Sequence, residues 1–149
     1  MHKLDQLTSE NKNVEISMFG YTEWQMYYKY NQNETYFGKY DVYVPTTFYY
    51  NPMDSETAKV DNGYRRWFHS DMQTALPRFA LTGYDHGQFF LRGYKKYGKR
   101  FEGARWQNGY ISLQNQLKFV KTGSKGGMQN SGFMLVHYRS GGGAETISY

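Results

Sequence analysis

The stretch FALTGYDHGQFFLRGYKKYGKRFE, residues 79–102, carries the clearest helix pattern in the chain. Asp85 is placed to cap a helix start, and Gln88 three positions later completes a capping box. Gly98 is a stop signal near the end of the pattern. Aromatic residues recur at spacings of four, three and four, which places them on one helical stripe: Phe90, Tyr94, Tyr97 and Phe101. We therefore predict a helix that buries this aromatic stripe against a sheet.

Upstream of this stretch, helix and strand patterns alternate. Leu4 and Leu7 indicate a helix near the N-terminus, and VEISMF (residues 14–19) alternates in the manner of a strand. GYTEWQMYYKY (20–30) begins as a strand-to-helix loop over residues 21–24 and continues as a helix. A second strand is predicted in YDVYVPTTFYYN (40–51), where Pro45 marks an edge, a bulge or a strand end.

Asp54 or Ser55 is a candidate cap for the next helix, which extends through TAKVDNGYRRWFHSDMQ (57–73) and ends before Pro77. Beyond residue 102, ISLQNQLKFV (111–120) and FMLVHY (133–138) are predicted strands of a C-terminal β-hairpin with a long Gly-rich tip. We expect a single α/β domain over residues 1–139. Residues 140–149 are expected to form a flexible Gly-rich tail with at most a short final strand.

Composition indicates an ordered domain with a Tyr-rich core. The chain has 149 residues, among them 16 Tyr, 10 Phe and 3 Trp, and no Cys. The missing thiols exclude disulfides, zinc–thiolate sites and cysteine nucleophiles. Mean hydropathy is −0.84, and no apolar run reaches the roughly 18 residues that a membrane span needs. The N-terminal MHKLDQLTSENKN lacks the basic and apolar regions of a signal peptide.

No catalytic or metal-binding motif stands out. Two His–acid pairs occur, His69 with Asp71 and Asp85 with His86, but a metal site needs three or more converging ligands. Asp85 is already assigned a capping role. The chain has no nucleophile elbow, no HExxH and no phosphate-binding Gly loop. We therefore predict a protein without cofactor, metal or enzymatic activity.

Basic and aromatic residues interleave in RGYKKYGKR (92–100). Two explanations fit this pattern. A helix that packs its rings inward and turns its lysines to water accounts for it, and we favour this explanation. The alternative function is that of a basic, Tyr-rich nucleic-acid-binding domain that uses Lys95, Lys96 and Lys99.

Polar and aromatic residues gather where the two predicted strands end. In open α/β sheets, ligands bind at the carboxyl ends of strands. Either these residues form a small-molecule site, or the rings fill a core that is poor in aliphatic side chains. The candidate ligand-binding residues are Tyr21, Glu23, Trp24, Thr46, Thr47 and Tyr49.

Five segments, in this order, carry a family resemblance: FGYTEWQMY (19–27), YDVYVPTTFYY (40–50), YRRWFHSDMQTALPRFALTGYDHGQFFLRGYKKYGKRFE (64–102), SLQNQLKFVKTG (112–123) and GGMQNSGFMLVHY (126–138). Together they resemble the C-terminal part of a Bacteroidetes family in which a type I periplasmic-binding-protein-like domain follows peptidoglycan-binding lysin-motif repeats. More distantly, they are similar to the closing half of branched-chain amino-acid receptors.

The resemblance implies a three-layer αβα fold of partial type I periplasmic-binding-protein type and ligand capture without chemistry. The implied ligand is a small molecule or a peptidoglycan-derived compound, touched by Glu23, Thr46 and Thr47. If the chain is part of a longer secreted precursor, the implied location is the periplasm or cell envelope. The chain lacks lysin-motif repeats and the first half of such a domain. We therefore expect it either to pack against another protein chain or the missing N-terminal half, or to close a smaller sheet of its own.

Overall fold

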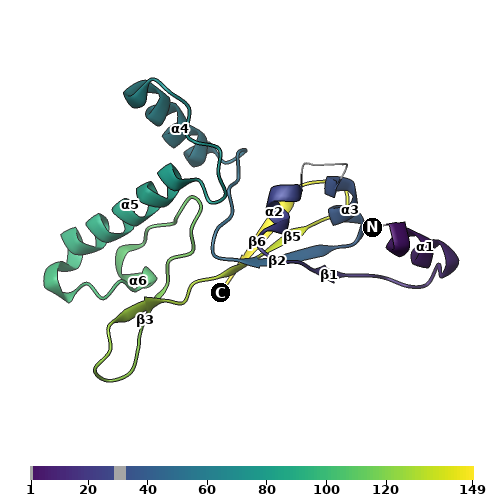
Figure 1. Cartoon of the computed structure of the whole chain (residues 1–149). Coiled ribbons are helices and arrows are strands. Elements are labelled where there is room, and N and C mark those ends of the chain that lie inside the picture. Colours follow the sequence, from purple (N-terminus) through teal and green to yellow (C-terminus); the bar gives the residue numbers. More distant parts are fainter. Residues whose placement is uncertain (1, 29–32) are drawn as a thin grey trace. The chain divides into compact units, whose positions relative to one another are not determined.

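The computed structural model describes residues 2–28 and 33–149 and has a mixed α/β fold, as the sequence predicts (Figure 1). The chain forms two compact units, and a single α/β domain over residues 1–139 stays a prediction. Unit 1 comprises Met1–Thr46 and Met134–Ile147, and unit 2 comprises Thr47–Phe133 and Ser148–Tyr149. Each unit is described below by itself. Over the described residues, no helix has both the length and the apolar character needed to cross a membrane.

Unit 1 is built on a four-stranded mixed sheet in the order β1-β2-β5-β6. Strand β1 runs parallel to β2, and β2 runs antiparallel to β5. Three helices accompany the sheet. The elements are α1 (His2–Glu10), β1 (Met18–Phe19), α2 (Trp24–Tyr27), α3 (Asn33–Lys39), β2 (Val42–Thr46), β5 (Met134–Tyr138) and β6 (Ala144–Ser148).

The core of unit 1 lies on one face of this sheet. The register pairs Val44 with Val136, and both side chains are fully buried. Helix α3 covers this face with the buried ring of Phe37, whose centroid lies 5.0 Å from that of Tyr138. Aromatic packing thus replaces much of the aliphatic volume of an ordinary core, as the composition predicts.

Several predictions for unit 1 are confirmed and others need correction. The helix near the N-terminus, the loop over residues 21–24 and the strand at Val42–Thr46 are present, with Pro45 next to the strand end. Strand β1 is shorter than the predicted 14–19, and α3 was not predicted. Tyr30, expected in the helix after residue 24, lies outside the described residues. Strand β6 occupies half of the predicted tail.

Unit 2 is mainly helical. Its elements are α4 (Ser55–Phe68), α5 (Phe79–Tyr97), the 3-10 turn η1 (Gly98–Arg100), α6 (Arg105–Asn108), β3 (Phe119–Lys121) and β4 (Met128–Asn130). The predicted cap of α4 is confirmed, because the Asp54 carboxylate accepts the Thr57 backbone N–H at 2.7 Å. The helix ends earlier than predicted, at Phe68, with His69 in the left-handed region (φ 52°).

Helix α5 corrects the central sequence prediction. It begins at Phe79, so Asp85 lies within the helix and does not cap it. The predicted stop at Gly98 is confirmed. The buried stripe consists of residues spaced by four: Leu81, Asp85, Phe89 and Gly93. Phe90 and Tyr94, predicted to be buried, are 44% and 62% exposed. The stripe was misplaced because its true members include one acid and one glycine, which a hydrophobic pattern does not count.

The predicted C-terminal hairpin is also wrong in its partners. Strand β3, which overlaps the end of the first predicted strand, pairs with β4 in the predicted tip, while β5 pairs with β2. Residues 111–118 form no strand, because the Asp85 carboxylate accepts the backbone N–H groups of Leu113, Gln114 and Asn115 at 2.7–2.9 Å. The Tyr110 hydroxyl donates to the same carboxylate at 2.8 Å. Those N–H groups are therefore unavailable to a sheet ladder.

Candidate functional site

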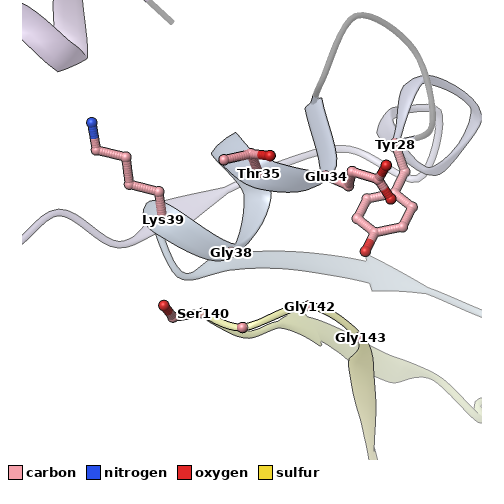
Figure 2. A pocket seen from close by; sticks show the side chains of 9 residues that line it. Tyr28, Glu34, Thr35, Gly38, Lys39, Ser140, Gly142 and Gly143 are labelled. Atoms are coloured by element: carbon pink, nitrogen blue, oxygen red, sulfur yellow. The ribbon is translucent and has the colours of Figure 1, made fainter.

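A pocket of about 590 Å³ opens in unit 1 between α3 and the turn that joins β5 to β6 (Figure 2). Helix α3 supplies one wall, the turn supplies the other, and Tyr28 adds an aromatic side. The lining residues are Tyr28, Glu34, Thr35, Gly38, Lys39, Ser140, Gly141, Gly142 and Gly143. The pocket therefore combines one ring with groups of both charges, hydroxyls and a glycine backbone.

Glycines are required on both walls. Gly141, Gly142 and Gly143 have φ values of 92°, 90° and 87°, a region that side-chain-bearing residues rarely adopt. On the opposite wall, a Cβ at Gly38 would lie 2.6 Å from the Arg139 carbonyl oxygen. Only glycine permits the helix to approach the turn this closely. The shape of the pocket thus follows from four glycines in two separate segments.

A charged network around His137 fixes the base of the turn. The imidazole lies on β5, and its Nε2 contacts the Asp41 carboxylate at 2.5 Å while Nδ1 contacts Glu145 on β6 at 3.2 Å. Arg139 also donates to Glu145. The ring stacks on Tyr43, with centroids 4.0 Å apart. This network joins the end of α3 to both strands that lead into the glycine turn.

The contact with His137 also affects the pKa of Asp41. The bond from His137, reinforced by the Ser17 hydroxyl at 3.0 Å, lowers the pKa of Asp41. The network therefore favours the ionised form of Asp41.

The pocket lining includes a carboxylate, a phenol and an ammonium. Figure 2 shows the Glu34 carboxylate beside the Tyr28 ring, and Lys39 at the other end of α3. Burial, and then the charge of Glu34, raise the pKa of Tyr28, so its hydroxyl remains protonated at neutral pH. The Lys39 ammonium pairs with Asp5 of α1, whose bond raises the pKa of Lys39. The phenol of Tyr28 and the ammonium of Lys39 therefore both remain protonated at neutral pH.

The predicted ligand-binding residues lie elsewhere, and none of them lines this pocket. Two hydrogen bonds bring the segment that contains Tyr21, Glu23 and Trp24 to the end of β2: the Thr22 hydroxyl donates to the Pro45 carbonyl oxygen, and Gln25 donates to Thr46. This neighbourhood was expected.

Thr47 and Tyr49 belong to unit 2, where their backbones pair with Gln116 and Gln114. A ligand-binding role for the six predicted residues stays a prediction.

The acids of the two His–acid pairs, Asp71 and Asp85, are bound to other groups of the protein. Asp71 pairs with Arg65 at 3.2 Å. The Asp85 carboxylate is fully buried and accepts five hydrogen bonds. Within the ranges 2–28 and 33–149, no group of three or more His, Asp or Glu side chains is arranged to hold a metal ion. The network at His137 was missed, although a histidine inside the apolar run FMLVHY was a signal for a buried polar partner.

Searches with this chain against protein-family models, curated proteins and solved structures yield no match.

Proposed function

We propose that this chain is a non-enzymatic solute-binding module that captures a small zwitterionic ligand in the pocket of unit 1. The observation that carries the proposal is the presence of opposite charges, Glu34 and Lys39, on one helix wall facing a glycine turn. A ligand ammonium would pair with the Glu34 carboxylate. A ligand carboxylate would accept hydrogen bonds from Lys39, the Thr35 hydroxyl or backbone N–H groups of the turn.

Amino acids and peptidoglycan-derived peptides carry this pair of charges. Both ligand classes agree with the resemblance to the closing half of a type I periplasmic-binding domain. In this proposal the chain is part of a three-layer αβα domain of a cell-envelope or periplasmic protein. Another chain or an N-terminal half completes the domain. The exposed rings of Phe19 and Tyr21 at the edge strand β1, 69% and 73% exposed, support such a partner.

Isothermal titration calorimetry of the full chain against free amino acids, short peptides and muropeptides tests the proposal. We expect saturable binding that Glu34→Gln weakens about 10- to 100-fold, because a charge-assisted hydrogen bond contributes about 1.5–3 kcal/mol. Glu15→Gln is the matched control, since Glu15 is exposed in unit 1 and is not a lining residue. The control should bind as the parent chain does.

A modified ligand tests the need for an ammonium group separately from the role of the pocket. A compound with its amine acetylated keeps the carboxylate and loses the cation, so it should bind the parent chain as weakly as the free amino acid binds Glu34→Gln. Equal affinity of the parent chain and Glu34→Gln for every ligand would refute the role of this pocket. Absence of saturable binding to all three ligand classes would refute solute capture.

A further inference from the structure

The two units carry charge of opposite sign. Unit 2 contains 13 Lys and Arg against 6 Asp and Glu, a net charge of +7, whereas unit 1 contains 5 against 7, a net charge of −2. Together they give the +5 of the whole chain. Residues 92–125 include nine basic residues and a single acidic residue, Glu102. The excess of positive charge is therefore confined to one segment of unit 2.

Eight of these nine basic side chains are described, and all eight are exposed: Arg92, Lys95, Lys96, Lys99, Arg100, Lys118, Lys121 and Lys125. In the part of the chain that the structure describes, none of the eight forms an ion pair. Mutual repulsion without internal neutralisation costs stability. A polyanionic partner would remove that cost.

One hydrophobic core gathers the segments that carry these cations. Phe89 of α5 packs on Phe101 and on Phe119 of β3, with each ring centroid 5.7 Å away. Tyr110 completes the cluster, and the Arg92 guanidinium lies 5.1 Å from its ring centroid. The end of α5, the residues after it and the β3–β4 hairpin therefore belong to one packed body.

The segments that carry the cations also carry exposed rings. Tyr94 precedes Lys95 and is 62% exposed, while Trp106 of α6 is 78% exposed. Phe90 adds a third ring that is 44% exposed. We define the basic aromatic surface as these three rings together with the eight exposed cations.

We propose that the basic aromatic surface of unit 2 binds single-stranded nucleic acid. Cations along the backbone path neutralise phosphates, and exposed rings stack on unpaired bases without a sequence requirement. An anionic membrane offers the same charges, but a helix that lies in a membrane needs a continuous apolar face separate from its polar face. In α5 the outward Tyr94 is followed directly by Lys95 and Lys96, so the rings and charges are interleaved.

Fluorescence anisotropy with fluorescein-labelled 15-nucleotide oligo-dT and oligo-U tests the proposal on the full chain. We expect saturable binding whose affinity falls linearly with salt on logarithmic axes, by about 0.7 for each phosphate contacted. The charge reversal Lys95→Glu, Lys96→Glu, Lys99→Glu should lower that slope by about two. The control reversal Lys3→Glu, Lys12→Glu, Arg66→Glu changes the net charge equally at exposed positions outside the surface and should keep the slope.

The rings are tested separately. Trp106→Ala should weaken oligonucleotide binding at least about fivefold while leaving the salt slope unchanged, because stacking is not electrostatic. Trp67→Ala is the control, since Trp67 is 81% exposed on α4 of the same unit. Circular dichroism shows whether each variant keeps its fold.

If both charge-reversal variants lose oligonucleotide affinity equally, the proposal is overturned, because binding would then depend on net charge alone. Equal binding to duplex and single strand, with Trp106→Ala matching Trp67→Ala, would overturn it as well. Binding to vesicles of phosphatidylglycerol with none to oligonucleotides would assign the surface to membranes instead.

Discussion

Replacement of Asp85 by asparagine tests the carboxylate that accepts the most hydrogen bonds among the residues that the structure describes. The carboxylate is fully buried, and its two oxygens accept five hydrogen bonds. One oxygen accepts from Tyr110 and Leu113, and the other from the backbone of Gln114 and from both the backbone and side chain of Asn115. Asparagine keeps the shape of the side chain but replaces one oxygen by an NH₂ group, which faces donors.

The magnitude follows from the bonds lost. If the amide oxygen keeps the bonds of Tyr110 and Leu113, the NH₂ group meets the N–H groups of Gln114 and Asn115 donor to donor. Each unsatisfied buried donor costs about 1–3 kcal/mol, and the loss of a buried charge among its partners costs about 3–5 kcal/mol. We expect the free energy of unfolding to fall by about 3–5 kcal/mol, which is a large part of the 5–15 kcal/mol typical of a whole domain.

Urea unfolding measures the global effect, and amide hydrogen exchange by NMR measures it at the site. With a slope near 2 kcal/mol/M, the midpoint should fall by about 2 M. The amides of residues 113–115 should lose protection first. Asp71→Asn is the control. Asp71 is exposed and its ion pair with Arg65 lies at the surface, so the loss of this carboxylate should cost under about 1 kcal/mol. Equal midpoints for Asp85→Asn and the control, with protection retained at residues 113–115, would refute this account.

Two further variants test packing and charge. Gly93→Ala should destabilise the chain by about 1–3 kcal/mol, because the new Cβ would lie 2.2 Å from the Phe101 ring. Gly87→Ala on the same helix is the control, since its Cβ would have no atom within 4 Å. In the same urea assay this control should stabilise the chain by up to about 1 kcal/mol. The hydrogen bond from His137 lowers the pKa of Asp41 in the folded state. The ionised carboxylate therefore stabilises the fold at a pH above the pKa of Asp41 in the unfolded chain. This stabilisation is lost as the pH falls through the lower pKa of Asp41 in the folded chain. Thermal melts of the parent chain and Asp41→Asn should therefore differ at pH 6, and the difference should begin to shrink as the pH falls below about 4. A constant difference would contradict this coupling.

Local signals of the sequence were sufficient for the elements they control. The Asp54 cap, the Gly98 stop and the strand at Val42–Thr46 each depend on residues within a few positions of one another, and all three are present. Such features follow from backbone chemistry, which does not require knowledge of the tertiary structure.

Asp85 shows why the longer-range features could not be predicted. An acid followed three residues later by glutamine has the pattern of a capping box. The same carboxylate serves a loop 28–30 positions further along the chain. A sequence pattern does not distinguish a carboxylate that caps its own helix from one that binds a remote backbone. The misplaced hairpin follows from the same error, because that loop was expected to be a strand.

The candidate site was missed for a related reason. Gly141, Gly142 and Gly143 have the composition of a flexible tail, and only the close approach of Gly38 to Arg139 turns them into a pocket wall. That approach depends on contacts between segments about 100 positions apart in the chain. The residues predicted from strand ends did come together in part, since hydrogen bonds from Thr22 and Gln25 reach the end of β2.

The net charge of the whole chain hides the feature that best separates the two proposed binding functions. A charge of +5 is modest for 149 residues, but it is the sum of a negative unit 1 and a strongly positive unit 2. A zwitterion bound between Glu34 and Lys39 is neutral overall, so its affinity should depend weakly on salt. A polyanion releases counterions, and its affinity should fall steeply. A salt series measured with both ligands therefore assigns each function to its own unit. Glu34→Gln should change only the affinity for the zwitterion. The charge reversal at Lys95, Lys96 and Lys99 should change only the affinity for the polyanion.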